Sequence, residues 1–427
     1  MIRRTLSAST RTGRVLPVLL IVLSLGAFAG ADWPQFLGPG GASVTKDKGL
    51  PTTWSESENI VWKTAMPGFG ASSPIVVGDK ILVTAYSGYG QGEEKGKEED
   101  LTLHLLCIDA AGGKIVWDKS VKASLPETPY GGFMPLHGYA SSTPVSDGKA
   151  VYVFFGRTGV FAYSLAGEKL WQADVGTKTH GWGSATSPIL AGKLLIVNAS
   201  VESGAVVALN TADGKEAWRA EDIRDSWSTP ALLTLPGGKQ ELVVSSHGKV
   251  RGFDPADGKK LWECEAVPDY ICPSVVTHGD VAYVTSSRKA GCLAVRGGGS
   301  GDVTSTHKLW QIPKTPNVPS PLYDDGHLYW VSASGIATCV KADDGKIVYE
   351  ERISGLGRVY GSLLLADGKL YCASREKGIG VVLAAGPEFK ELARNDIGDK
   401  SVFNATPVPC NGRLLLRSDR FLYYVGK

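Results

Sequence analysis

The stretch LNTADGKEAW, residues 209–218, decides the fold of this chain because related phrases recur along the sequence. An Asp-Gly pair at its centre supplies the positive φ that a tight hairpin turn needs, and an apolar segment flanks the pair on each side. A phrase that returns at a regular period indicates a repeat architecture. The other copies are IDAAGGKIVW ending at Trp117, FDPADGKKLW ending at Trp262, VKADDGKIVY ending at Tyr349, and the looser YSLAGEKLW and STHKLW ending at Trp171 and Trp310.

A second recurring phrase, Ser or Thr with Pro before an apolar segment and a glycine turn, divides the chain into units. Most anchors are roughly 42 to 48 residues apart, and the longer step from Pro74 to Pro144 carries two extra loops. Each unit contains four strand-like segments, which is typical of a propeller blade. We therefore predict an all-β propeller of four-stranded antiparallel blades. The anchors are Pro74, Pro144, Pro188, Pro230, Pro273, Pro321 and Pro407, with a proline-less copy from Tyr360.

The two ends of the chain complement each other. The last unit, from Asn404, has no fourth strand, whereas NIVWKTAMP (Asn59 to Pro67) reads as a fourth strand with no blade before it. Joining them gives eight blades and leaves no exposed sheet edge, so we predict that the N-terminal strand closes the last blade. The recurrent Trp of the outer strands is predicted to pack between blades, with its indole N–H donating to a neighbouring backbone carbonyl.

The N-terminus has the features of an export signal. Four arginines precede an apolar run from Val15 to Phe28, and the small residues AGA follow at 29–31. We predict a signal peptide at 1–31, an N-terminal extension at 32–53 and the propeller at 54–427, with an uncleaved membrane anchor as the alternative for the first segment. The mature protein is expected to be monomeric, periplasmic or secreted, and without an integral membrane domain.

Composition excludes several function classes. The chain has 45 basic and 43 acidic residues, and a near-neutral balance argues against nucleic acid as a partner. Seven cysteines occur without a C-x-x-C pair, so we expect small buried hydrophobic residues rather than a zinc or redox site. G-x-S-x-G, H-E-x-x-H and P-loop motifs do not occur. We therefore predict no catalytic residue and no metal ligand.

The repeated phrases and the outer-strand Trp resemble the pyrroloquinoline-quinone (PQQ) repeat family over residues 54–427. Within it, the chain is similar to exported bacterial proteins that open with WPQF-GP, here DWPQFLGPGG from Asp32, and that share HGYASSTP, HGWGSATSP and DSWSTP. This resemblance implies an eight-bladed propeller.

Two relatives within that family imply different functions. PQQ-dependent dehydrogenases of alcohols and sugars imply a quinone, a calcium ion and an aspartate base in the axial pit, but their adjacent cysteine pair is missing here. The propeller lipoprotein of outer-membrane β-barrel assembly implies a scaffold without a cofactor, but its lipid-anchoring cysteine is missing too.

The candidate site follows from blade topology. The phrase HGW lies just before an innermost strand, so it belongs to the face that carries the loops between the second and third strands. The slot of Trp182 is aromatic in seven of eight units, with Phe69 and Phe403 among them, and the two extra loops, Ser87 to Asp100 and Lys122 to Leu136, belong to the same face. The predicted ligand-binding residues are His137, Tyr139, His180, Trp182, Asp225, Trp227, Tyr270, Asn317, Arg358, Tyr360 and Asn404.

Two interpretations of these residues remain open at this point. The aromatic rings either hold a ligand by stacking or plug the narrow end of the channel. His137 and His180 either take part in a site or stabilise turns by hydrogen bonds. The leading functional hypothesis is a non-catalytic exported scaffold that binds a protein or glycan and needs no cofactor. The rival is a PQQ- and calcium-dependent dehydrogenase of alcohols or sugars.

Overall fold

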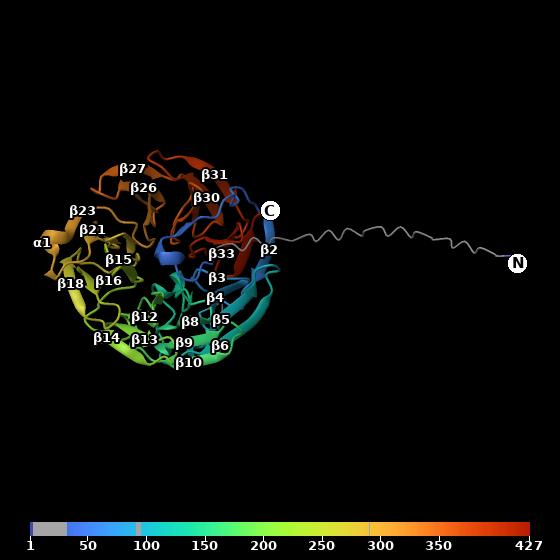
Figure 1. The fold of residues 1–427 in the computed structure, drawn as a ribbon, viewed down its shortest axis with the longest axis horizontal. Helices are drawn as coiled ribbons and strands as arrows, with labels where there is room; N and C mark the ends of the chain where they lie inside the picture. The colour runs from blue at the N-terminus through green and yellow to red at the C-terminus, as the bar shows by residue number, and fades with distance from the viewer. Residues whose placement is uncertain (3–31, 91–94, 290) are drawn as a thin grey trace.

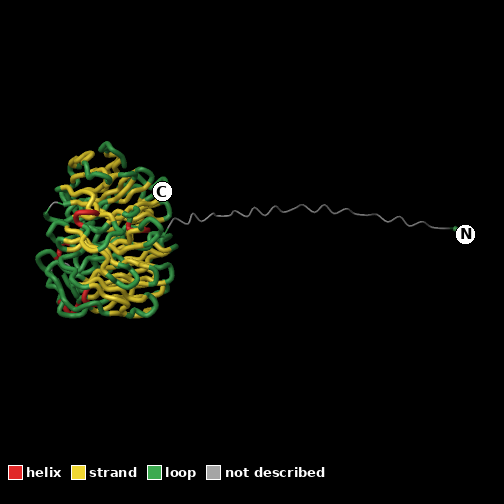
Figure 2. Tube along the Cα trace, turned by 60° about the vertical axis from the view of Figure 1, so that its left-hand side comes forward, coloured by secondary structure: helices red, strands yellow, loops and turns green. Residues whose placement is uncertain are grey.

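The computed structural model describes residues 1–2, 32–90, 95–289 and 291–427. The predicted signal peptide and part of the charged run in the first extra loop therefore lie outside the described residues. Eight sheets stand around a central axis as the blades of a propeller (Figures 1 and 2). Among the described residues, no helix is both long and apolar enough to cross a membrane.

The four strands of each blade run antiparallel from the axis outwards, so the predicted fold class is confirmed. The strands of blades one to four are β3 (Ile75–Val77), β4 (Lys80–Ser87), β5 (Thr102–Asp109), β6 (Ile115–Lys122); β7 (Val145–Ser146), β8 (Ala150–Phe154), β9 (Val160–Ser164), β10 (Lys169–Ala173); β11 (Ile189–Ala191), β12 (Leu194–Ala199), β13 (Ala205–Asn210), β14 (Glu216–Ala220); and β15 (Ala231–Thr234), β16 (Gln240–Ser246), β17 (Lys249–Phe253), β18 (Lys260–Glu265). Those of blades five to eight are β19 (Val276–His278), β20 (Val281–Thr285), β21 (Cys292–Arg296), β23 (Lys308–Ile312); β24 (Leu322–Asp324), β25 (His327–Val331), β26 (Ile336–Lys341), β27 (Ile347–Arg352); β28 (Leu364–Ala366), β29 (Lys369–Ala373), β30 (Ile379–Ala384), β31 (Glu391–Asp396); and β32 (Val408–Cys410), β33 (Arg413–Arg417), β34 (Phe421–Val425), β2 (Ile60–Ala65).

The ring closes as predicted. Strand β2 pairs antiparallel with β34, Trp62 opposite Tyr424, and completes the eighth blade. The C-terminus lies beside β2 in Figure 1, and the N–H of Gly426 donates to the carbonyl of Asn59. One blade is thus built from both ends of the chain.

The hydrophobic core lies between blades, because both faces of every inner strand are covered. In β5, Leu105 and Cys107 pack towards the second blade while Leu106 and Ile108 pack towards the eighth. This explains why the strand reads as a nearly continuous apolar run. All seven cysteines are free thiols; six are buried in strands as predicted, and the half-buried Cys272 lies in the link before β19.

Five of the outer-strand tryptophans join neighbouring blades as predicted. Each indole N–H donates to a backbone carbonyl of the next blade, for example Trp171 to Thr211 at 2.8 Å and Trp218 to Pro255 at 3.1 Å. The ring covers the hairpin glycine of that blade, and a Cβ on Gly214 would lie 2.5 Å from the ring of Trp171. The remaining three of these bonds run from Trp62 to Ala110, from Trp117 to Leu165 and from Trp310 to Ala342.

The prediction of a backbone acceptor is wrong for Trp262. Its indole N–H donates 2.7 Å to the buried carboxylate of Glu241 in its own blade. The cause lies in blade five, where a glycine-rich insertion replaces the usual hairpin phrase and forms β22 (Gly301–Asp302) and α1 (Thr304–His307). Strand β22 pairs parallel with β18 and extends the fourth sheet to five strands.

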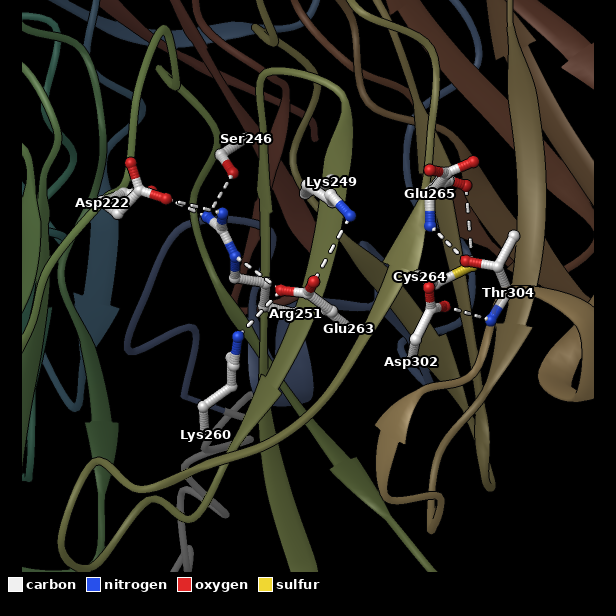
Figure 3. A network of polar contacts seen from close by, with 10 residues as sticks. All are labelled: Asp222, Ser246, Lys249, Arg251, Lys260, Glu263, Cys264, Glu265, Asp302 and Thr304. Atoms are coloured by element: carbon white, nitrogen blue, oxygen red, sulfur yellow. Dashed lines mark hydrogen bonds and ion pairs between the residues drawn. The ribbon is translucent and has the colours of Figure 1, made fainter.

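Ion pairs reinforce this extended sheet at the surface. The carboxylate of Glu263 on β18 forms ion pairs with the ammonium groups of Lys249 at 3.3 Å and Lys260 at 2.9 Å. The guanidinium of Arg251 lies 3.7 Å from the same carboxylate (Figure 3). The hydroxyl of Thr304 accepts the backbone N–H of Glu265, which fastens α1 to the same strand. Single exposed pairs contribute little stability, so the insertion is held mainly by the pairing of β22 with β18 and by the Thr304 bond.

Blade seven has no tryptophan on its outer strand, and the residue directly after the N-terminal extension supplies one. Trp54 is 4% exposed and packs against Gly380 of β30. Its backbone N–H donates to the side-chain carbonyl of Asn395, whose amide donates back to the carbonyl of Thr52. The predicted extension, residues 32–53, is thus bound to the propeller and leads directly into this contact.

Candidate functional site

A pit of about 300 Å³ lies on the propeller axis. Its wall comes from the links that enter each innermost strand, the face on which the sequence placed the candidate site. Loops from that face form the rim, and Phe36 of the N-terminal extension forms the floor. The pit is therefore a pocket closed at one end rather than an open channel.

The closing segment crosses the opposite face of the disc. Trp33 exchanges two backbone hydrogen bonds with Val76 in blade one, and the carbonyl of Pro34 accepts the N–H of Ser146 in blade two. The chain then passes the axis at η1 (Pro39–Gly41), the blue segment near the centre of Figure 1. Strand β1 (Val44–Thr45) pairs parallel with β28 in blade seven. The WPQF-GP phrase is therefore an axial plug, a role that sequence reasoning did not assign.

Eight hydroxyl groups form a closed ring within the pit, one from each blade. The backbone N–H of each residue donates to the Oγ of the corresponding residue in the next blade, at 2.9 to 3.1 Å, and the last bond returns to the first blade. All eight side chains line the pit. The ring consists of Ser73, Thr143, Ser187, Thr229, Ser274, Ser320, Ser362 and Thr406.

One side of the rim is an aromatic cluster. The ring centroids of Trp182 lie 5.0 Å from those of Trp227 and 4.5 Å from those of Tyr270, and Phe133 packs edge-on against Trp182 at 5.2 Å. The indole N–H of Trp227 donates to the carbonyl of Gly183, which fixes this ring in the wall. On the far side, Tyr360 lies under the guanidinium of Arg375 at 4.9 Å.

The end of the second extra loop, Lys122 to Leu136, covers part of the pit. It contains η3 (Met134–Leu136), and Phe133 and Leu136 line the cavity. The carbonyl of Leu136 accepts hydrogen bonds from Arg375 at 3.0 Å and Asn404 at 2.7 Å, so the loop reaches from blade two to blades seven and eight. We call residues 131–138 the lid.

His137 anchors the lid and is neutral. Its Nε2 lies 2.8 Å from the carbonyl oxygen of Trp182, so this nitrogen carries the proton, and Nδ1 accepts from Ser141 at 2.7 Å. Burial lowers the pKa of the imidazole, and the Arg375 charge lowers it further. The interpretation of this histidine as a source of loop-stabilising hydrogen bonds agrees with the structure.

Seven of the eleven predicted residues line the pit, and four lie near it. Tyr139 packs against Tyr86 beside the lid, while His180 is exposed and stacks edge-on against Trp227 at 4.9 Å. Asp225 faces His247, and Arg358 pairs with Glu376 at the surface. The lining members are His137, Trp182, Trp227, Tyr270, Asn317, Tyr360 and Asn404.

Sequence reasoning missed other parts of the pit. The ring hydroxyls belong to the Ser/Thr-Pro phrase that recurs in every unit, so their recurrence marks the blades and does not single out a site. Phe36 and Phe133 come from segments outside the repeat, so no period marks them. Arg375 gave no local signal at all. Phe69 and Phe403, although in the aromatic slot, pack beside Tyr86 and Tyr423 instead of lining the pit.

The pit is lined without formal charge. Among the described residues that line it, none is Asp, Glu, Lys or Arg. Across the described parts of the chain, no group of three or more His, Cys, Asp or Glu is placed to hold a metal ion. Cys272 lines the wall as a neutral thiol, because burial raises its pKa to about 11. The cavity therefore offers hydroxyl, amide and aromatic groups.

These groups do not fit PQQ with calcium, the cofactor pair of the dehydrogenase hypothesis. PQQ carries several carboxylates, which need cationic partners when they are buried. Calcium takes oxygen ligands, with carboxylates foremost among them. The lining supplies neither a cationic side chain nor a carboxylate.

A separate polar cluster in blade one has the connectivity of a hydrolase triad. Ser87 Oγ lies 2.8 Å from His104 Nε2, and His104 Nδ1 lies 3.0 Å from the Asp118 carboxylate. None of the three lines the axial pit or a second cavity, which lies between η1 and the innermost strands β11, β15 and β19. The cluster satisfies both nitrogens of a buried histidine, which explains it structurally.

Comparison with known proteins places the chain in a family. The PQQ-repeat family described as "Outer membrane protein assembly factor BamB" matches residues 38–181, 100–300 and 246–386, which together span most of the chain. Outer membrane protein assembly factor BamB of Escherichia coli (strain K12) is 31% identical over 113 residues, covering 25% of this chain and 28% of that protein. The chain thus matches less than a third of the length of this curated relative.

Solved structures share the fold at low identity. BamB from Moraxella catarrhalis superposes with a TM-score of 0.59 at 11% identity, covering 86% of this chain and 99% of that one. Quinohemoprotein alcohol dehydrogenase from Comamonas testosteroni superposes with a TM-score of 0.66 at 11% identity, covering 94% and 82%. At such identity the likeness concerns the fold alone. With the repeat matched over most of its length and eight blades closed into a ring, the chain belongs to the PQQ-repeat β-propeller family of the BamB type.

Proposed function

We propose that this chain is an exported, non-catalytic propeller that serves as a binding or assembly scaffold, with the axial pit and its rim as the contact surface for a protein or glycan. The observation that carries the proposal is the uncharged, aromatic pit on the face that holds the lid and both extra loops. Insertions gathered on one face of a repeat fold usually build a binding surface. The name of the BamB relatives, an assembly factor, supports a protein partner.

The proposed location is the periplasm or the medium, and the proposed state is a monomer. The arginine-rich, apolar sequence of residues 1–31 supports export. Because β2 covers β34, the eighth blade is as complete as the others and has no missing strand for a second copy to supply, which supports the monomer.

The scaffold proposal is tested by co-sedimentation of purified protein with the cell-envelope fraction of its host. A rim variant, Trp182→Ala with Tyr270→Ala, is compared with a control on the opposite face, Asp213→Ala with Lys215→Ala. We expect the rim variant to lose most of its retention and the control to keep it. Protease or glycan-hydrolase treatment of the envelope then identifies the kind of partner. Equal retention of both variants would contradict the proposal.

The dehydrogenase rival has its own test. Purified protein is titrated with PQQ in the presence of calcium while absorbance is followed, and dye-linked oxidation of alcohols and sugars is measured. Because the lining offers no partner for the carboxylates of PQQ, we expect no saturable change and no oxidation. Saturable binding coupled to oxidation would overturn the non-catalytic proposal.

A further inference from the structure

We propose that the axial pit binds the terminal unit of a neutral saccharide, with the hydroxyl ring as its polar contact and the aromatic cluster as its stacking wall. This inference rests on the proposed function and names the ligand class of the same site. It is carried by three features of the pit: unused hydroxyl donors, missing charge and an aromatic wall.

The hydroxyl ring retains hydrogen-bonding capacity towards the axis. Each Oγ accepts one backbone N–H from the preceding blade, which occupies one of its two lone pairs. Among the described residues, none of the eight hydroxyls has a protein acceptor for its own proton in the observed hydrogen bonds. Each group can therefore donate one bond and accept another, as the hydroxyls of a sugar do.

The hydroxyl protons of this ring need a partner from within the pit, because buried polar groups are hydrogen-bonded. Water within a polar cavity satisfies such groups, and a ligand displaces it favourably when it reproduces the same hydrogen bonds. A polyol has alternating donors and acceptors around its ring and meets this requirement at several positions. An apolar ligand would leave the hydroxyls of Ser187 and Thr229 without partners, at a cost in affinity.

The missing charge disfavours anions and metal ions as ligands of the pit. An anion in the pit would be buried without a counter-charge, because the nearby guanidinium of Arg375 is already bonded to Glu376, Asn404 and the lid carbonyl of Leu136. A metal cation would find no carboxylate ligand in the lining. An organic cation is attracted by aromatic faces as well, and glycine betaine in the probe panel below tests this class. A neutral ligand has neither penalty.

The aromatic wall suits the apolar face of a sugar ring. Trp182 is partly exposed, and its neighbours Trp227, Tyr270 and Phe133 hold it in position. Aromatic faces carry negative electrostatic potential and attract the polarised C–H groups of a pyranose. A side chain fixed by packing loses little entropy when it binds.

The size of the pit limits the ligand to its end unit. A volume of about 300 Å³ is at the lower end of the range for small-ligand sites, and Phe36 closes the far end. The lid covers part of the entrance, so a long chain cannot lie along the axis. The geometry points to end-on insertion of one sugar unit, with the rest of the glycan lying over the rim.

The test is a calorimetric titration of the mature propeller with a panel of probes. The panel contains methyl glycosides and short oligosaccharides of neutral sugars, the matching uronic acids, glycine betaine, and a short peptide with a free carboxylate. Tryptophan fluorescence of the rim is followed in parallel. We expect saturable binding of at least one neutral glycoside, with its uronic acid bound at least tenfold more weakly.

Isosteric variants locate the site. Thr229→Val removes one ring hydroxyl at constant shape. The control Thr186→Val removes a buried hydroxyl next to the ring member Ser187, in a residue that does not line the pit. We expect Thr229→Val to weaken glycoside binding roughly tenfold and Thr186→Val to leave it unchanged. Thr143→Val and Thr406→Val repeat the test should Thr229→Val fail to fold, which circular dichroism shows.

The possible outcomes distinguish a failure of the saccharide proposal from a failure of the scaffold proposal on which it rests. Binding of only acidic, cationic or peptide probes, weakened by Thr229→Val, would overturn the saccharide class while keeping the pit as a binding site. Glycoside binding unaffected by every ring variant would overturn the assignment to the pit. No binding by any probe would overturn the saccharide proposal alone. Equal retention of the rim variant and the control variant on envelopes would overturn the scaffold proposal as well.

Discussion

At the scale of single residues, small polar side chains hold the centre of the propeller. A Ser or Thr hydroxyl is the shortest group that can accept a backbone N–H from the neighbouring blade and still face the axis, and the same bond occurs eight times. Larger polar side chains in the interior do not recur from blade to blade, and each has its own environment. Glu202 and His137 are two of them, and their environments predict measurable behaviour.

Glu202 makes the stability of the fold depend on pH. Its side chain is 2% exposed, its carboxylate accepts the hydroxyl of Ser184, and burial raises its pKa from 4.5 to about 7, with a further increase from the Glu127 charge. The folded state therefore holds the proton more tightly than the unfolded chain. The stabilisation is fully present below pH 4.5 and is lost as the pH rises through about 7, an effect of about 3 kcal/mol.

The variant Glu202→Gln tests this dependence. At pH 8 the variant is expected to be more stable than the wild type by up to about 3 kcal/mol, and near pH 4.5 the two are expected to be similar. Urea unfolding of both proteins across this pH range measures the difference. A difference that is independent of pH would contradict the assignment to Glu202.

The two histidines of the repeated HG phrase differ in their roles. His137 joins two links through Ser141 and Trp182, so His137→Ala is expected to lower the free energy of unfolding by about 1–3 kcal/mol. His180 is exposed, and His180→Ala is expected to cost less than about 1 kcal/mol. Thermal or urea unfolding of the single variants measures both. Similar losses would contradict this distinction.

At the scale of the element, the hairpin glycine and the tryptophan of the first recurring phrase act together in the contact between blades. Its hairpin glycine has a positive φ and no side chain, so the tryptophan of the preceding blade can lie flat on the turn and donate to the backbone beside it. Where blade five lost the phrase to an insertion, Trp262 turned to Glu241 instead. The turn and the tryptophan are therefore parts of one contact between blades.

Substitutions at two glycines of blade three distinguish the energetic effect of this tryptophan contact from that of backbone strain. Gly214 has φ +71 with the ring of Trp171 within 2.5 Å of an added Cβ, whereas Gly192 has φ +60 with open space around it. Gly192→Ala is expected to cost about 1 kcal/mol through strain alone. Gly214→Ala is expected to cost a further 1–3 kcal/mol, roughly, through the clash. Equal losses in the free energy of unfolding, measured with urea, would contradict this expectation and show that the Trp171 ring moves aside without cost.

At the scale of the whole molecule, the N-terminal segment makes three separate contacts that complete the propeller. It plugs the axis with Phe36, supplies Trp54 to blade seven and provides β2 as the last strand. Each contact joins residues more than 300 positions apart or crosses the axis, so the segment holds the ring shut. A ring closed by both termini also removes the exposed edge of β34.

Truncation tests the closure. A chain of residues 32–427 is expected to fold as a monomer, whereas residues 67–427 are expected to melt more than about 10 °C lower and to self-associate through β34. Differential scanning calorimetry and size-exclusion chromatography measure both properties. A monomeric 67–427 chain with an unchanged melting temperature would contradict the role assigned to β2.

The sequence by itself determined the blade, the number of blades and their closure, because hairpin turns, strand periods and the outer tryptophan are local and repeat. It also determined the face of the candidate site, since blade topology sends each link to a known side of the disc. Only the tertiary structure decided what the pit contains. The hydroxyl ring, the plug with Phe36 and the latch of Arg375 on the lid join residues far apart in the chain, and such contacts leave no period in a sequence. The predictions for Trp262 and for the four candidates outside the pit depart from the structure for the same reason. The contacts of each side chain depend on residues that are distant in the sequence, and an insertion in another blade can change them.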